Sequence, residues 1–119
     1  MSPKRFDRLV RQALSTLPEE FREYLHNVLI TVEPEPRPEH LEEMQDDTLL
    51  GLYIGTPLTE QGLDELYHLP DRILLFQGPL EAMCRTDQEL AEQVRITVVH
   101  EIGHHFGLSE EEIVAVLGP

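Results

Sequence analysis

One stretch near the C-terminal end of the sequence constrains the fold most. It runs from His100 to Glu110 and reads HEIGHHFGLSE. His100 and His104 are four residues apart, and on an α-helix this spacing places them about 40° apart around the axis and about one turn apart along it. Both imidazoles can therefore reach one metal ion, provided that the chain is helical here.

The residues before this stretch independently predict that helix. Thr86 and Glu89 have the spacing of a capping box, which marks a helix start. Apolar residues occupy most sides of the segment between Val94 and Phe106, which indicates a helix buried on more than one face. We expect this helix to end at Gly107.

The same spacing gives different roles to the neighbouring acidic residues. Glu101 lies on the strip next to the two histidines, where it can act as a general base on a water molecule. Catalytic zinc usually has three protein ligands and keeps a fourth position for water. Glu110 is the best candidate for the third ligand, because a turn at Gly107 can fold the chain back towards His104. Glu111, Glu112 or a more distant carboxylate remain alternatives, since an acidic, capped helix start also accounts for this run.

The other histidines are expected to have ordinary roles. His105 is about 140° around the helix from His100, which favours packing or a supporting hydrogen bond over metal binding. His26, His40 and His68 are isolated in the sequence. A helix that merely contains packed histidines is the simplest alternative to a metal site.

Two further helices are predicted at the start of the chain and one at its end. The first begins at Pro3, with Ser2 as its N-cap, and its apolar residues continue at helical spacing to Leu17. Thr16 and Glu19 suggest a capping box for a second short helix that ends before Asn27. The last helix is expected over Glu110 to Leu117, behind a capping box of Ser109 and Glu112.

Three short segments between these helices predict strands, each stopped by proline or glycine. They are residues 28–33, 49–54 and 71–77. The stretch HLEEMQDD after Pro38 is expected to form at most one helical turn, and residues 58–69 a loop. The predicted fold class is α+β: a small mixed sheet of about three to four strands, packed against N-terminal helices and a long C-terminal helix. With 119 residues, of which 40% are hydrophobic, we expect one domain spanning residues 1–119.

Charge and cysteine content narrow the classes of partner and compartment. The formal net charge of -14 disfavours nucleic acid and anionic membrane surfaces as partners. The basic residues near the N-terminus are expected to form a solvated helix face. Cys84 is the single cysteine, so no internal disulfide can form, and we find neither an apolar leader nor a run long enough to span a membrane. We therefore expect a cytoplasmic protein, of an oligomeric state that the sequence does not decide.

The motif and its context also carry a family resemblance. HEIGHHFGLSE resembles the extended zincin signature H-E-x-x-H-x-x-G-x-x-(H/D). The whole chain is similar to small bacterial proteins with a minimal zincin fold that are described as possible neutral zinc metallopeptidases. The likeness covers the N-terminal helical part, the segments LLGLYIGTPL and LPDRILLFQGPL, and the motif helix.

The resemblance implies zinc as the cofactor, bound by His100, His104 and Glu110, and a peptide or protein as the substrate. It implies a zinc-activated water that attacks the peptide bond, with Glu101 as general base. It also implies an edge strand that pairs with the extended substrate, for which Ile73 to Gln77 is the candidate. A buried core strand is the alternative for the same segment. Tyr53 and Tyr67 are candidate oxyanion donors, although spacing selects neither.

The chain departs from the larger zincins in its ligand set and its length. An acidic residue stands where metzincins have a third histidine, and the nine residues after Glu110 contain no methionine for a Met-turn. There is no room for the downstream glutamate helix of the larger gluzincins. The main hypothesis is a zinc-dependent peptide hydrolase. The alternatives are a non-catalytic zinc-binding interaction module with an acidic surface, and a metal-free interaction domain.

Overall fold

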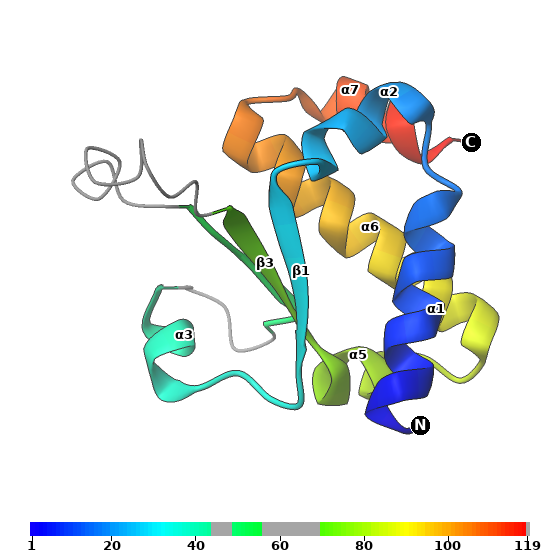
Figure 1. The fold of residues 1–119 in the computed structure, drawn as a ribbon, viewed down its shortest axis with the longest axis vertical. Helices are drawn as coiled ribbons and strands as arrows, with labels where there is room; N and C mark the ends of the chain where they lie inside the picture. The colour runs from blue at the N-terminus through cyan, green and yellow to red at the C-terminus, as the bar shows by residue number, and fades with distance from the viewer. Residues whose placement is uncertain (44–48, 56–69, 119) are drawn as a thin grey trace.

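A computed structural model describes residues 1–43, 49–55 and 70–118 of the chain. Its helices and strands form an α+β fold around a small mixed sheet (Figure 1). In chain order the elements are α1 (Pro3–Ser15), α2 (Glu19–Arg22), the 3-10 turn η1 (Glu23–Leu25), β1 (Val28–Glu33), α3 (Pro38–Glu43), β2 (Gly51–Ile54), β3 (Asp71–Phe76), α5 (Gln77–Met83), α6 (Asp87–Phe106) and α7 (Glu110–Leu117).

The sheet has three strands in the order β1-β3-β2. β1 runs parallel to β3, and β2 runs antiparallel to it. Ile73 and Leu75 of β3 are buried in the core that the sheet shares with the helices, while Leu74 and Phe76 are buried with Leu49 and Leu52 in a second cluster. Because alternate residues of a strand point to opposite faces, β3 is covered on both sides.

The central position of β3 corrects one prediction. The prediction that Ile73 to Gln77 is an edge strand that pairs with substrate is wrong, and the alternative, a buried core strand, is confirmed. A continuous apolar run buried on both faces is typical of an inner strand, and β3 has a strand on either side. The edges of the described sheet are β1 and β2.

α1 and α6 lie together on one side of the sheet (Figure 1). Phe6 and Val10 of α1 pack with Val94 and Val98 of α6 in the main core. The buried residues of α6 are Leu90, Val94, Thr97, Val98, Val99, Ile102 and Gly103. This spread around the axis confirms the prediction of a helix buried on more than one face.

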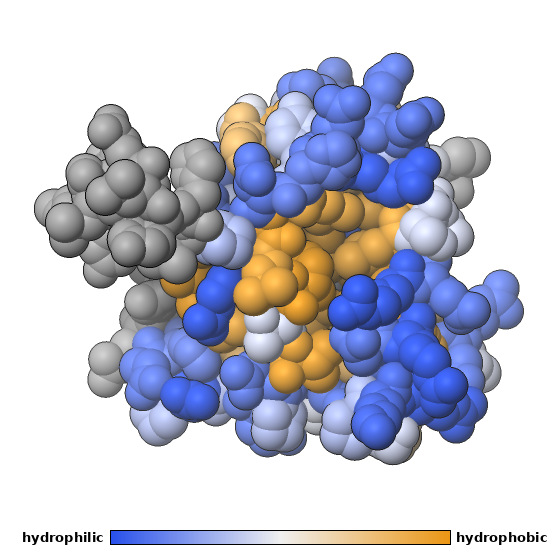
Figure 2. Space-filling model, in the orientation of Figure 1, coloured by the Kyte–Doolittle hydropathy of each residue, from blue (hydrophilic) through white to orange (hydrophobic). Residues whose placement is uncertain are grey.

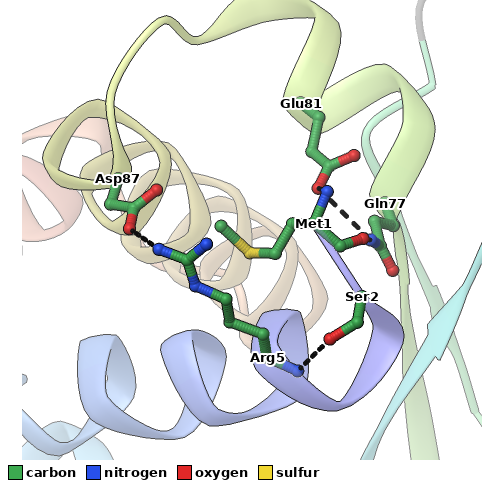
Figure 3. A network of polar contacts seen from close by, with 6 residues as sticks. All are labelled: Met1, Ser2, Arg5, Gln77, Glu81 and Asp87. Atoms are coloured by element: carbon green, nitrogen blue, oxygen red, sulfur yellow. Dashed lines mark hydrogen bonds and ion pairs between the residues drawn. The ribbon is translucent and has the colours of Figure 1, made fainter.

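Polar contacts fix the start of α1 beside α5 and α6 (Figure 3). The Met1 amino group lies 3.4 Å from Glu81, and Gln77 donates to the Met1 carbonyl oxygen at 2.8 Å. Arg5 pairs with Asp87 at 2.7 Å, which links α1 to the first turn of α6. The Ser2 hydroxyl accepts a hydrogen bond from the Arg5 backbone N–H, so the predicted N-cap is confirmed.

Two local predictions differ from the structure. Thr16 does not cap the second helix. Its hydroxyl donates to the Ala13 carbonyl oxygen at the end of α1, and α2 begins after Pro18 without a side-chain cap. The third strand ends at Phe76, and Gln77 starts α5, a helix that the sequence pattern does not predict. Pro79 favours a break in the chain, but proline is tolerated in the first turn of a helix, where backbone N–H groups lack intrahelical partners.

The expected helical turn after Pro38 is present as α3, although residues 44–48 of that stretch lie outside the described residues. The loop expected over residues 58–69 lies outside them as well. Figure 2 shows apolar residues gathered in the middle of the face on which β1 lies, with polar residues around them. No helix of the described residues is long and apolar enough to cross a membrane. The cytoplasmic location stays a prediction.

Candidate metal centre

The candidate residues lie at the C-terminal end of α6 and at the start of α7. The predicted boundaries of α6 are confirmed. The Thr86 hydroxyl accepts a hydrogen bond from the Glu89 backbone N–H, and Gly107 ends the helix in the left-handed conformation with φ 74°. The Leu108 backbone N–H then donates to the Gly103 carbonyl oxygen at 2.7 Å. This reversal turns the chain back towards the histidines.

A close contact between helices holds α7 in place. Ile113 is fully buried, and a Cβ atom placed on Gly103 would lie 2.8 Å from its side chain. The predicted capping box is also present: the Ser109 hydroxyl accepts from the Glu112 N–H, and the Glu112 carboxylate accepts from the Ser109 N–H. Glu110, the first residue of α7, is therefore held beside α6.

The Glu110 carboxylate lies between the two motif histidines. One of its oxygens is 3.5 Å from His104 Nε2, and the other is 3.7 Å from His100 Nε2. Two ligand atoms bound to one tetrahedral zinc ion at about 2.0–2.2 Å are about 3.4 Å apart. The separations are thus close to those of a zinc site.

These side chains are not gathered into a finished metal cluster. In the described part of the chain, no group of three or more His, Cys, Asp or Glu side chains is arranged to hold a metal ion. The two short separations involve different oxygens of Glu110, so one oxygen would have to move towards both histidines. The Glu110 side chain is 72% exposed and can make this adjustment. The donor set of two imidazoles and a carboxylate therefore fits zinc once this side chain turns.

One of the histidines is already oriented for metal binding. His100 Nδ1 lies 3.0 Å from the Ile96 carbonyl oxygen. A carbonyl can only accept, so Nδ1 carries the proton and Nε2 of the neutral ring keeps its lone pair. A bond of this kind to the remote ring nitrogen is the usual support for a metal-binding histidine.

Glu101 is held by the sheet rather than by α7. Its Oε1 accepts a hydrogen bond of 3.0 Å from the Tyr53 backbone N–H in β2. Burial raises the pKa of Glu101 above its ordinary value, while the hydrogen bond from Tyr53 and the nearby His104 and His100 act in the opposite direction. The carboxylate is therefore fixed beside the histidines and accepts a proton more readily than an exposed glutamate does.

Tyr53 and His105 form a separate contact next to the site. Their rings stack with centroids 3.9 Å apart, and the Tyr53 hydroxyl donates to Asp71 Oδ2 at 2.6 Å. His105 Nε2 lies 3.9 Å from the same oxygen. Burial, and then the hydrogen bond to Asp71, raise the pKa of Tyr53 well above its usual range. His105 is thus placed away from the His100 and His104 pair, as its angle around the helix predicts.

Among the other predicted residues, His40 is not part of this group. His40 accepts a hydrogen bond from the Arg37 N–H and lies against Phe76. Tyr67 and His68 lie outside the described residues. The hydrogen bond from the Tyr53 backbone N–H to Glu101 cannot be predicted from the sequence, because almost every residue type has a backbone N–H. It depends on how β2 and α6 meet in the fold.

Comparisons with known proteins found a matching family and a similar solved structure. The family model described as zincin-like metallopeptidase matches residues 25–117. Among solved structures, the chain is similar to a conserved hypothetical protein from Thermus thermophilus, with 25% identity and a TM-score of 0.58. The match covers 89% of this chain and 94% of that one. No curated protein matches the chain.

Proposed function

The chain belongs to the zincin-like metallopeptidase family, and from that premise we propose that it is a zinc-dependent peptide hydrolase. In this proposal His100, His104 and Glu110 hold the zinc ion, and Glu101 is the general base. The observation that carries it is the Glu110 carboxylate, which lies 3.5 Å and 3.7 Å from the Nε2 atoms of His104 and His100. One domain, over residues 1–119, is sufficient to hold these parts.

The proposed chemistry divides between the metal and the chain. Bound zinc would polarise the scissile carbonyl and lower the pKa of a water molecule. Glu101 removes the proton from the attacking water and later delivers it to the leaving amine nitrogen. The Tyr53 N–H holds one carboxylate oxygen of Glu101, which leaves the second oxygen to carry that proton.

We also propose that β2 is the strand along which an extended peptide binds. β2 is an edge of the described sheet, and its Tyr53 N–H already bonds to Glu101. A peptide paired along this edge would pass next to the general base. The Tyr53 hydroxyl is a poorer candidate for the oxyanion donor, because it donates to Asp71.

Substitution of Glu101 by glutamine tests the proposal. Glu101→Gln removes the base but no metal ligand, so we expect zinc affinity within about threefold of the wild type and a loss of turnover of about 10²–10⁴-fold. Zinc content and cleavage of an unbiased peptide library are measured on both proteins. A zinc-loaded wild type that cleaves no peptide would instead support the non-catalytic zinc-binding module, and a protein that takes up no zinc would contradict both.

A further inference from the structure

A groove lies between α2 and η1 on one side and α7 on the other, at one end of the molecule (Figure 1). Its volume is about 470 Å³, within the range of about 300–1,000 Å³ that ligand pockets usually have. The described residues that line it are Pro18, Glu20, Phe21, Tyr24, Leu108, Glu112, Ala115 and Val116. The groove is thus built from the two short helical segments near the start of the chain and the last helix.

Most of the lining of this groove is apolar. Phe21 is buried, and its ring centroid lies 5.5 Å from that of Tyr24. Tyr24 is 37% exposed and lies in turn 5.0 Å from Phe106, which is also exposed. Leu108 and Val116 add aliphatic surface from the side of α7. Aromatic rings that stay open to solvent offer a large contact area to an apolar side chain of a partner.

The charged residues that line the groove are both acidic, Glu20 and Glu112. The elements beside the groove carry the same charge. There are three glutamates on α2 and η1 and three on α7, against one arginine, Arg22. Figure 2 shows hydrophilic residues over this end of the molecule. This excess of negative charge attracts a basic segment and repels an acidic one, and the exposed Tyr24 ring offers a face to a cation.

The groove lies on the far side of α7 from the proposed metal site. Each residue of an α-helix turns about 100° further around the axis, so Glu112, Ala115 and Val116 lie about 140–240° from Glu110. The face of α7 that lines the groove is therefore opposite the face that carries Glu110. A segment in the groove contacts α2 and α7 together, apart from a peptide bond at the histidines.

We propose that this groove is a docking site for a segment of a partner protein that combines basic and apolar side chains. Its lysine or arginine side chains lie near Glu20 and Glu112, and its apolar side chains pack against Tyr24 and Val116. The docked segment holds α7 against α2, and so steadies the helix that carries Glu110. Docking is independent of the proposed function, because neither zinc nor cleavage takes part in it.

The probe is a fluorescently labelled peptide of alternating leucine and lysine, and the control peptide has glutamate in place of lysine. Binding to the zinc-free protein is followed by fluorescence anisotropy. We expect the lysine peptide to bind about tenfold or more tightly than the glutamate peptide at low salt, with a smaller difference at high salt. The net charge of -14 attracts any cationic peptide, so matched variants are needed to locate the binding site.

Two pairs of variants change the total charge equally and differ in position. Glu20→Lys and Glu19→Lys reverse adjacent charges in the first turn of α2, and of the two residues Glu20 lines the groove. Ala115→Lys and Val114→Lys add a charge at adjacent exposed positions of α7, and of these Ala115 lines the groove. We expect Glu20→Lys and Ala115→Lys to weaken binding of the lysine peptide about fivefold more than their matched controls. Thermal unfolding checks that all four variants are folded.

Hydrogen exchange on the zinc-free protein tests the effect on α7. Slower amide exchange in α7 with bound lysine peptide would support the holding of this helix, and unchanged exchange would overturn it. Equal weakening within each pair of variants would show a general attraction to the acidic chain and overturn the docking site.

Two other occupants have outcomes of their own. Cleavage of the lysine peptide by the zinc-loaded wild type, slowed by Glu20→Lys and not by Glu19→Lys, would identify a substrate segment and overturn the separate partner. A dimer in sedimentation that Ala115→Lys abolishes and Val114→Lys does not would make a second copy the occupant, and overturn it too. Zinc uptake and cleavage of other peptides without binding of the lysine peptide would overturn the docking site alone. Groove-specific binding by a protein that takes up no zinc would overturn the proposed function alone.

Discussion

The two carboxylates of the candidate site are held in opposite ways. Glu101 lies partly buried on α6 and accepts a hydrogen bond from the backbone of β2. Both of these elements contact the core. Glu110 is 72% exposed on α7, a helix of eight residues whose one buried residue is Ile113. The fold itself therefore fixes Glu101, the proposed general base, while completion of the proposed metal site depends on the docking of one short helix.

The largest expected effect tests whether the histidine pair binds metal at all. His104→Ala should weaken zinc binding by more than about 100-fold, which exceeds the effect of losing a group that only orients a ligand. His105→Ala is the matched control, because His105 stacks on Tyr53 instead. Zinc affinity is measured by competition with a chelator. Equal losses of zinc affinity from both substitutions would contradict a metal site formed by the His100 and His104 pair.

The second prediction concerns the exposed side of the site. Glu110→Gln should weaken zinc binding by at least about 10–100-fold, whereas Glu111→Gln on the next residue should leave it unchanged. The two substitutions remove the same charge from the same helix turn. If Glu111→Gln has the larger effect, the third ligand is the alternative that the sequence leaves open.

The docking of α7 can be disturbed without touching a ligand. Gly103→Ala places a methyl group 2.8 Å from Ile113, and such overpacking costs about 1–3 kcal/mol. We expect weaker zinc binding and faster amide exchange in α7, with Glu101 still held by Tyr53.

Ile113→Val combined with Gly103→Ala should restore part of the zinc affinity, because a smaller side chain leaves room for the added methyl group. A general loss of stability without a specific loss of zinc would argue against a positioning role for this contact. Thermal unfolding with and without zinc separates the two outcomes.

The smallest effect is expected from the helix caps. Ser109→Ala removes the capping box of α7, and Thr86→Ala removes the cap of α6; each should cost about 1 kcal/mol of stability. Only Ser109→Ala should also reduce zinc affinity, because only α7 carries Glu110. Equal zinc affinities in the two variants would show that α7 holds Glu110 without help from its cap.

Local patterns made most of the fold predictable. The Thr86 cap, the capping box of Ser109 and Glu112, and the turn at Gly107 each involve residues close in sequence, and all are present in the structure. The predicted capping box at Thr86 is only half formed, because the Glu89 carboxylate accepts from the Arg85 N–H. Position within the sheet was less predictable. An apolar run such as β3 can be an edge or an inner strand, and pairing with β1 and β2 decides between them.

The candidate site divides in the same way. Helical spacing alone predicts His100, Glu101 and His104 as site residues. The turn at Gly107 makes Glu110 the best candidate for the third ligand, but leaves Glu111 and Glu112 as alternatives. The Tyr53 N–H and the contact of Gly103 with Ile113 depend on how distant elements pack. No pattern of residue types in the sequence encodes them.

The most direct test of the proposed zinc site is a crystal structure of the zinc-soaked protein, with anomalous diffraction measured at the zinc edge. We predict one strong zinc peak, with the Nε2 atoms of His100 and His104 and a carboxylate oxygen of Glu110 at about 2.0–2.2 Å from it. Glu101 should lie near the ion without binding it. A protein that binds no zinc, or a peak that lacks Glu110 among its ligands, would contradict the proposed site.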